Sequence, residues 1–244
     1  MKLFAFRTCT LAIAAIVISA CTPESPESRL EQRRQSKLEK GAEALADCRE
    51  ALCSELKLNF ASLEDYAVLN EMTHVTALEF RYNTFESLED ISAMQQLEEL
   101  RIMATKIREV SAFADFENLT VLHIQSGLAE DVRPTLLQMP DLKDIAINLP
   151  DDGDISFAHS LRDLEAISVL GGKILDLDPL AGHPSLRNLY IHSGLPSDLS
   201  ALLEIPNLQT LTVFDTIERE DSSGVIGQLK AKGITVRLIP SVVI

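Results

Sequence analysis

The five histidines and four cysteines of this chain are its most obvious candidates for metal binding or nucleophilic chemistry. His123 and His192 fall at outward positions of predicted strands, but three strands apart, so roughly 14 Å would separate them. A metal ion needs its ligands at about 2.1 Å. The remaining histidines are expected on turns away from the sheet: His74, His159 and His183. Because no serine, histidine and acid can be placed together on one sheet edge, we expect neither an enzyme nor a metal or other cofactor.

Two short motifs have part of the pattern of a ligand-binding loop. Asp151-Asp152-Gly153-Asp154 has the opening spacing of a calcium loop but lacks the glutamate that such a loop carries at its twelfth position. A plain acidic turn is therefore favoured over a calcium site. Gly171-Gly172 is interpreted as a turn, because the lysine of a phosphate-binding loop does not follow it.

The composition indicates a folded protein with an aliphatic core. Apolar residues make up 46% of the 244 residues and charged residues 24%, whereas aromatic residues reach only 5% and tryptophan is absent. The formal charge of −15 argues against nucleic acid or anionic lipid as a partner attracted by bulk electrostatics. We interpret this diffuse acidity as a contribution to solubility.

One six-residue pattern recurs along most of the chain. In Leu164-Glu165-Ala166-Ile167-Ser168-Val169, apolar residues occupy the first, fourth and sixth positions. Heads of this kind begin at Cys53, Val75, Leu97, Leu119, Leu142, Leu164, Leu186 and Leu208. They are spaced by 22 residues, with one step of 23 after Leu119. Alternation over six residues predicts a short strand with one buried face, and repetition in one direction predicts a parallel sheet.

This repeat resembles the leucine-rich repeat family, whose units of about 20–29 residues open with L-x-x-L-x-L. The return segment Ile174-Leu175-Asp176-Leu177-Asp178-Pro179-Leu180-Ala181 resembles the internalin type. The resemblance implies an α/β solenoid with a curved parallel sheet on its concave side and short turns or 3₁₀ segments on its convex side. The family usually has asparagine at the ninth position, bonding neighbouring coils. Only Asn83 fits here, although threonine could partly substitute, so the curvature stays open.

A solenoid exposes apolar surface at both ends unless capping elements cover it. We predict an N-terminal capping helix over residues 29–52, with one stripe of side chains against the first coil: Leu38, Ala42, Leu45, Arg49 and Leu52. At the other end, residues 224–232 are predicted to form a helix closed by Gly233, followed by a last strand over residues 234–238. The leucine-rich repeat domain with its C-terminal cap therefore covers residues 53–244.

The N-terminal segment is interpreted as a lipoprotein signal peptide over residues 1–20. Lys2 and Arg7 precede an apolar run too short to span a membrane. The run ends in Ile18-Ser19-Ala20-Cys21, which resembles the bacterial lipobox, whose cysteine is diacylated and becomes the first residue. An ordinary signal peptide cleaved after Ala20 is the alternative. Residues 21–28, rich in proline, serine and glutamate, are expected to be the lipidated cysteine and a disordered tether.

The resemblance to lipoproteins also predicts the cellular location. Thr22, and not aspartate, follows the cysteine, which implies the outer membrane if the organism has two membranes. Otherwise the anchor would lie in the outer leaflet of the cell membrane. In an exported protein the pair Cys48 and Cys53 indicates a disulfide. The disulfide requires the helix to end near residues 49–52, and two buried thiols are the alternative.

Positions three, five, seven and eight of each head are expected to face outward from the concave sheet. At position five, Lys57, Glu79 and Arg101 would form an alternating charge ladder across strands. Aromatic and apolar side chains gather instead in the C-terminal half, as protein interfaces prefer. Scattered exposed apolar residues are the alternative. The predicted partner-binding residues are Tyr190, His192, Phe214, Leu170, Leu149, Tyr82, Arg101 and His123.

The function expected from the repeats is non-enzymatic binding of a protein partner by a membrane-anchored lipoprotein. The chain would act as a monomer, attached to the membrane by its lipid anchor, with no nucleic acid as partner. A receptor or adhesin-like module is one form of this function. The alternative is an envelope scaffold or an inhibitor of a periplasmic enzyme of the same cell.

Overall fold

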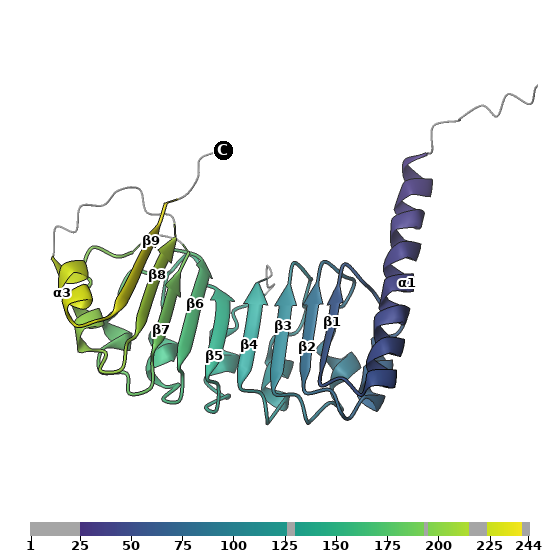
Figure 1. Cartoon of the computed structure of the whole chain (residues 1–244), viewed down its shortest axis with the longest axis horizontal. Coiled ribbons are helices and arrows are strands. Elements are labelled where there is room, and N and C mark those ends of the chain that lie inside the picture. Colours follow the sequence, from purple (N-terminus) through teal and green to yellow (C-terminus); the bar gives the residue numbers. More distant parts are fainter. Residues whose placement is uncertain (1–24, 126–129, 193–194, 215–223, 241–244) are drawn as a thin grey trace, which may run out of the picture.

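A computed structural model of the chain describes residues 25–125, 130–192, 195–214 and 224–240. Its strands form one parallel sheet in the order β1 to β9, which follows the sequence without a crossover (Figure 1). The predicted leucine-rich repeat solenoid is thereby confirmed. The signal peptide and the cysteine of the lipobox lie outside the described residues.

Each of the eight predicted heads forms one strand of this sheet, and the predicted C-terminal strand adds the ninth. The strands are β1 Glu55–Asn59, β2 Ala77–Arg81, β3 Glu99–Met103, β4 Val121–Gln125, β5 Asp144–Asn148, β6 Ala166–Gly171, β7 Asn188–Ile191, β8 Thr210–Phe214 and β9 Thr235–Ile239. Buried side chains at the fourth and sixth positions stand in register from coil to coil, as Leu56 with Leu78 and Leu78 with Leu100. Each such leucine contributes roughly 1.5–3 kcal/mol by leaving water.

The convex side is built from single helical turns. These are the 3₁₀ segments Tyr66–Glu71, Leu88–Ile91, Ser111–Asp115, Ser156–His159, Asp178–Leu180 and Ser200–Glu204, with the short α-helix α2 Arg133–Leu136. Acid or serine side chains begin several of these turns by accepting a backbone N–H two residues later. Asp65 does so from Ala67 at 2.8 Å, and Asp198 from Ser200 at 2.8 Å. Such local bonds favour turns over longer helices.

The N-terminal cap is the helix α1 Pro26–Ala51. It begins three residues earlier than predicted, so residues 26–28 belong to the helix and not to a tether. The reason is local: Ser25 accepts a hydrogen bond from the backbone N–H of Ser28 at 3.1 Å, and Pro26 occupies the first turn, where its missing N–H costs nothing.

The face of α1 that covers the first coil also differs from the predicted stripe. Gly41 and Cys48 are its buried residues. Of the predicted stripe, Leu45 is partly buried against the core, whereas Ala42 is exposed and Leu52 is 70% exposed. A Cβ atom added at Gly41 would lie 2.0 Å from the carbonyl oxygen of Ser62. Gly41 therefore determines which face of α1 packs on the first coil, because at this point the two backbones are too close for any side chain.

The two cysteines at the end of α1 are joined in a disulfide, with their Cα atoms 4.9 Å apart. The helix ends at Ala51, and the left-handed backbone of the next residue, Leu52 (φ 51°), turns the chain back on itself. This turn brings Cys53 beside Cys48, which a continuous helix could not do. The helix thus stops where the sequence argument required it to stop for a disulfide.

The C-terminal cap consists of α3 Val225–Ala231 and the edge strand β9. Gly233 follows the helix with φ 84°, a conformation that suits glycine. Between the two caps the buried apolar side chains form one continuous core, from Cys48 to Ile234. The described part of the chain therefore carries its own core and covers both of its ends. Among the described residues, no helix combines the length and apolarity that a membrane crossing requires.

Polar side chains connect consecutive coils at two edges. Asn83 donates to the carbonyl of Leu58 at 3.1 Å and accepts from the Thr105 hydroxyl at 3.3 Å, so threonine does extend the ninth-position ladder by one coil. A second set of amides stands immediately before the heads. Each donates to a backbone carbonyl of the preceding coil: Gln96 to Val75 at 3.0 Å, Asn118 to Gln95 at 2.7 Å and Asn207 to Pro184 at 2.5 Å.

Candidate protein-binding face

The half of the concave sheet next to α1 carries charged side chains that pair within their own strands. The pairs are Glu55 with Lys57 at 2.9 Å, Glu79 with Arg81 at 3.6 Å and Glu99 with Arg101 at 2.5 Å. The predicted cross-strand ladder of Lys57, Glu79 and Arg101 is therefore wrong in its pairing, although these residues are aligned in register. Residues two apart share a sheet face, and each charge finds its opposite there.

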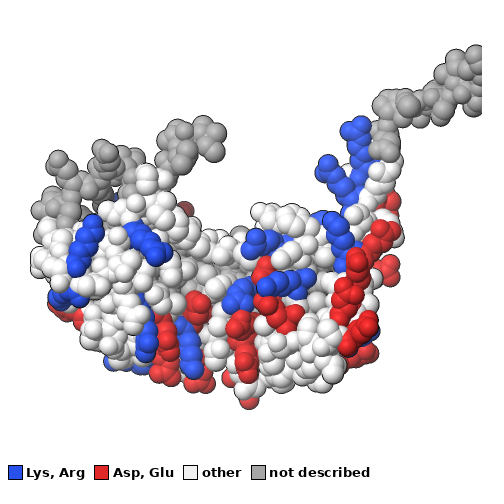
Figure 2. All heavy atoms as spheres, in the orientation of Figure 1, with Lys and Arg blue, Asp and Glu red and all other residues white. Residues whose placement is uncertain are grey.

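The other half of the face is hollowed, and no Asp, Glu, Lys or Arg lines the hollow. At its border, the carboxylate of Asp144 lies 3.1 Å from Nε2 of His123. In the position-five column, small side chains at Ala146 and Ser168 stand between the larger side chains of His123 and Tyr190. This difference in size leaves a hollow of about 440 Å³. Its lining residues are His123, Gln125, Ala146, Asn148, Ser168, Leu170, Tyr190, His192 and Phe214. Figure 2 shows a white strip in the middle of this side of the molecule, with charged side chains both near α1 and towards the C-terminal end.

A pair of stacked rings borders the hollow. The rings of His192 and Phe214 lie parallel, with centroids 4.2 Å apart and planes inclined by 16°. Partial burial lowers the pKa of His192, because the imidazolium form loses hydration there. The imidazole is therefore uncharged at neutral pH and presents an apolar face together with Phe214. Such rigid aromatic groups are the side chains that act as anchors in protein interfaces.

The structure brings five of the eight predicted binding residues together at this hollow: His123, Leu170, Tyr190, His192 and Phe214. Gln125 and Asn148 join them. Both were expected to face outward from position seven of their heads, but their polar side chains did not single them out as anchors. The signal that could have found them is their place in the same columns as the aromatic residues.

Leu149 is the clear error among the predicted contacts, because only 6% of it is exposed and it belongs to the core. The register shifts by one residue between Ile147 and Asn148, and the N–H of Leu149 donates to the carbonyl of Gly171 at 3.1 Å. In this region the left-handed backbone position falls one place later, on Gly172 with φ 73°. The shift turns the eighth position of the fifth head inward.

Two predicted residues lie apart from the hollow. Tyr82 stacks on Phe60 beside α1, with ring centroids 4.7 Å apart. Arg101 is engaged by Glu99 on the charged half of the sheet. Neither residue lines the hollow, so the predicted binding set divides into two separate surfaces.

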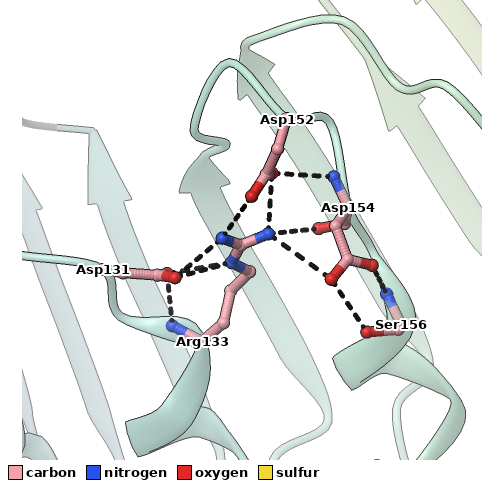
Figure 3. A network of polar contacts seen from close by, with 5 residues as sticks. All are labelled: Asp131, Arg133, Asp152, Asp154 and Ser156. Carbon is pink, nitrogen blue, oxygen red and sulfur yellow. Dashed lines mark hydrogen bonds and ion pairs between the residues drawn. The ribbon is translucent and has the colours of Figure 1, made fainter.

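The acidic turn at residues 151–154 is part of a polar network that the sequence argument missed (Figure 3). Arg133 of α2 donates to Asp131 at 2.7 Å and to both oxygens of Asp152 at 2.8 Å. These hydrogen bonds from Arg133 lower the pKa of both carboxyl groups. Asp154 accepts from the backbone N–H of Ser156 at 2.7 Å. The turn is thus tied to the preceding coil by one guanidinium group.

The described residues contain no cluster of three or more histidine, cysteine or acidic side chains suited to holding a metal ion. The side chains around the hollow are two amides, a hydroxyl, an aliphatic side chain and aromatic rings, a composition that suits a contact surface.

Comparisons with known proteins establish the fold and leave the ligand open. No protein-family model and no curated protein matches the chain. Solved structures do match. An internalin, InlF, from Listeria monocytogenes shares 20% identity and a TM-score of 0.58, and the match covers 76% of this chain and 61% of that one. Internalin C2 from the same organism gives 22% identity and a TM-score of 0.59, covering 76% of this chain and 80% of that one.

The chain therefore shares the fold of these internalin leucine-rich repeat structures. The chain spans less than two thirds of the length of the InlF structure. At such identities the likeness extends to the fold alone. What this chain binds must be argued from its own concave face.

Proposed function

We propose that the chain binds a protein partner through the uncharged hollow on its concave face. The observation that carries the proposal is the hollow itself, about 440 Å³ bordered by Tyr190 and by the stacked rings of His192 and Phe214. None of these rings is needed to fill the core. A recess lined by aromatic side chains and a few amide groups can bury an apolar side chain of a partner and orient it by hydrogen bonds.

We also propose that the protein is held at the cell envelope by acyl chains on Cys21. The support is the lipobox-like sequence and the basic and apolar segments before it. Acyl chains on one cysteine anchor a protein strongly, at about 0.8 kcal/mol for each buried methylene. Metabolic labelling with a fatty-acid analogue should mark the wild-type protein and not a Cys21→Ala variant. Equal labelling of both would contradict the anchor and leave the hollow unaffected.

Partner binding is tested by capture with residues 22–244, which include every described residue. The variant Tyr190→Ala/Phe214→Ala removes two rings from the hollow, and Phe60→Ala/Tyr82→Ala removes two rings from elsewhere on the molecule. Ala104 already occupies the position equivalent to Phe60 and Tyr82 with a left-handed backbone, so the control changes should fold. A partner recovered by wild type and control, but not by the hollow variant, supports the proposal. Equal recovery by all three would refute it.

A further inference from the structure

The N-terminal half of α1 has a basic side that the net charge of the chain conceals. Four cations recur at helical spacing: Arg29, Arg33, Lys37 and Lys40. At 100° per residue they fall within one narrow stripe, whereas Glu27 and Glu31 fall on the opposite side of the helix. Figure 2 shows blue side chains on the side of α1 that faces the concave surface and red ones on its outer side.

This basic stripe borders a recess with an exposed aromatic pair. The recess is about 410 Å³ and is lined by Arg29, Gln32, Arg33, Ser36, Lys37, Lys40 and Phe60. Phe60 is 51% exposed and stacks on Tyr82, which is 49% exposed. Lys37 fixes the arrangement, since its Nζ donates to the carbonyl of Tyr82 at 2.6 Å. Cations and exposed rings thus share one surface, which we call the basic groove.

The basic groove lies at the edge of the molecule nearest the proposed anchor. Phe60 and Tyr82 follow β1 and β2 directly, so they stand at the edge where the strands end. Beyond that same edge the N-terminal half of α1 extends (Figure 1). Cys21 and Pro26 are only five positions apart in the sequence, with four residues between them. A chain of that length reaches at most about 18 Å, so acyl chains on Cys21 would hold the basic groove close to the lipid headgroups.

We infer that the basic groove binds the surface of the membrane through its anionic phospholipid headgroups. The inference rests on the proposed anchor for its proximity to the membrane. Bulk charge argued against anionic lipid, but the interaction decays within about 10 Å, so the nearest charges decide it. Arginine and lysine attract headgroup phosphates, and aromatic rings favour the headgroup region. Docking would set the height of the solenoid above the membrane and its orientation relative to the membrane surface.

The test uses residues 22–244 and vesicles, so that its result does not depend on lipidation. The described residues form a core capped at both ends, and circular dichroism with a cooperative thermal transition verifies each variant. Co-sedimentation is measured with phosphatidylcholine vesicles alone and with vesicles containing 30% phosphatidylglycerol. Each basic residue near an anionic surface raises partitioning about five-fold. Arg33→Gln/Lys37→Gln/Lys40→Gln should therefore lower partitioning onto the anionic vesicles about 100-fold.

A matched control removes three exposed cations elsewhere, as Arg162→Gln/Lys173→Gln/Lys230→Gln, and should change partitioning less than two-fold. Equal binding of the wild type to both kinds of vesicle would overturn the inference, as would equal losses in the two triple variants. Binding of a polyglutamate peptide at the basic groove without vesicle binding would assign the groove to acidic protein segments instead. If the protein in cells proves to carry no acyl chains, while residues 22–244 still prefer anionic vesicles, only the proposed anchor is refuted.

Discussion

The two halves of the concave sheet share the same backbone arrangement but present different kinds of side chain. Over β1 to β3, glutamates pair with lysine or arginine two residues away, and the surface satisfies its own charges. Over β5 to β8, small and uncharged side chains open a hollow edged by rings. A partner that contacts the first half must break three ion pairs, whereas one that enters the hollow meets the contact between His123 and Asp144 at its border. Recognition should therefore concentrate in the second half.

The largest expected effect comes from filling the hollow. Ser168→Tyr places a ring between Ala146 and Tyr190 without changing the charge, and should weaken partner binding at least 100-fold, because the partner's anchor loses its site. Isothermal titration calorimetry with the captured partner measures the change. Lys57→Tyr, in the same column on the charged half, should change affinity less than three-fold. If Lys57→Tyr is equally damaging, the functional division between the halves does not exist.

The junction between the halves should show the next largest effect. Arg133 links Asp131 in one coil to Asp152 in the next. Arg133→Met leaves these acids facing each other without the guanidinium, and should lower Tm by about 3–6 °C at pH 7. Scanning calorimetry measures this loss. Arg162→Met, an exposed arginine on another turn, should leave Tm within about 1 °C.

The acid dependence of the same variant distinguishes a charged link from simple packing. The folded protein lowers the pKa of Asp131 and Asp152 below 3.8, so the unfolded chain binds more protons at low pH. The stabilisation is present above about pH 3.8 and is lost as pH falls through the folded values. The Tm difference between wild type and Arg133→Met should therefore shrink towards zero near pH 2. A difference that persists there would indicate packing.

His183, in the C-terminal half of the solenoid, should make the free energy of unfolding depend on pH, with a smaller effect. It is 1% exposed, and its Nε2 contacts the carbonyl of Leu161 at 2.9 Å while Nδ1 accepts from Leu186 N–H at 3.1 Å. The equivalent positions of earlier coils carry Met72 and Met94. Burial lowers the pKa of His183, so the unfolded chain takes up more protons below about pH 6.5, and stability falls there.

His183→Met should accordingly be nearly neutral at pH 7.5, within about 1 kcal/mol, because earlier coils accommodate methionine at this place. Between pH 7.5 and pH 5.5 it should lose less stability than the wild type. Urea unfolding at the two pH values measures the difference. His192→Gln, at the half-buried ring pair, serves as a control for a second histidine whose pKa is lowered. An identical pH dependence in wild type and His183→Met would show that His183 is not the titrating group.

Periodicity predicted the fold well because the repeat is local: every coil buries the same positions against its neighbours. The heads at Leu164 and Leu186 became β6 and β7 in the expected register. Periodicity could not predict a feature that depends on a single departure from the repeat. The one-residue shift at Ile147 buried Leu149, and the close approach at Gly41 redirected the buried face of α1. Both depend on contacts between backbones, which the type of side chain does not report.

The binding surface was predicted in part for the same reason. Columns followed from register, so Tyr190, His192 and Phe214 were found together. The pairing of charges was not predicted, because a glutamate can reach a partner along its own strand as easily as one on the next strand. Arg133 was missed because its partners lie on turns, where no repeat fixes the position of a side chain.

The smallest expected effect belongs to the charged half, and it decides whether that half is only a solvated surface. Glu55→Gln/Glu79→Gln/Glu99→Gln removes the acid from each strand pair. Ion pairs at the surface are worth roughly 0–1 kcal/mol each and are screened by salt, and Glu79, with 12% of its side chain exposed, is the most buried of these acids. The variant should lose at most about 2 kcal/mol in 50 mM salt, less in 500 mM, and bind the partner within three-fold of wild type. Glu64→Gln/Glu109→Gln/Glu117→Gln matches its change in net charge at exposed convex positions. A ten-fold loss of affinity in the concave variant alone would extend the binding face across both halves, because self-satisfied charges would then be contributing to recognition.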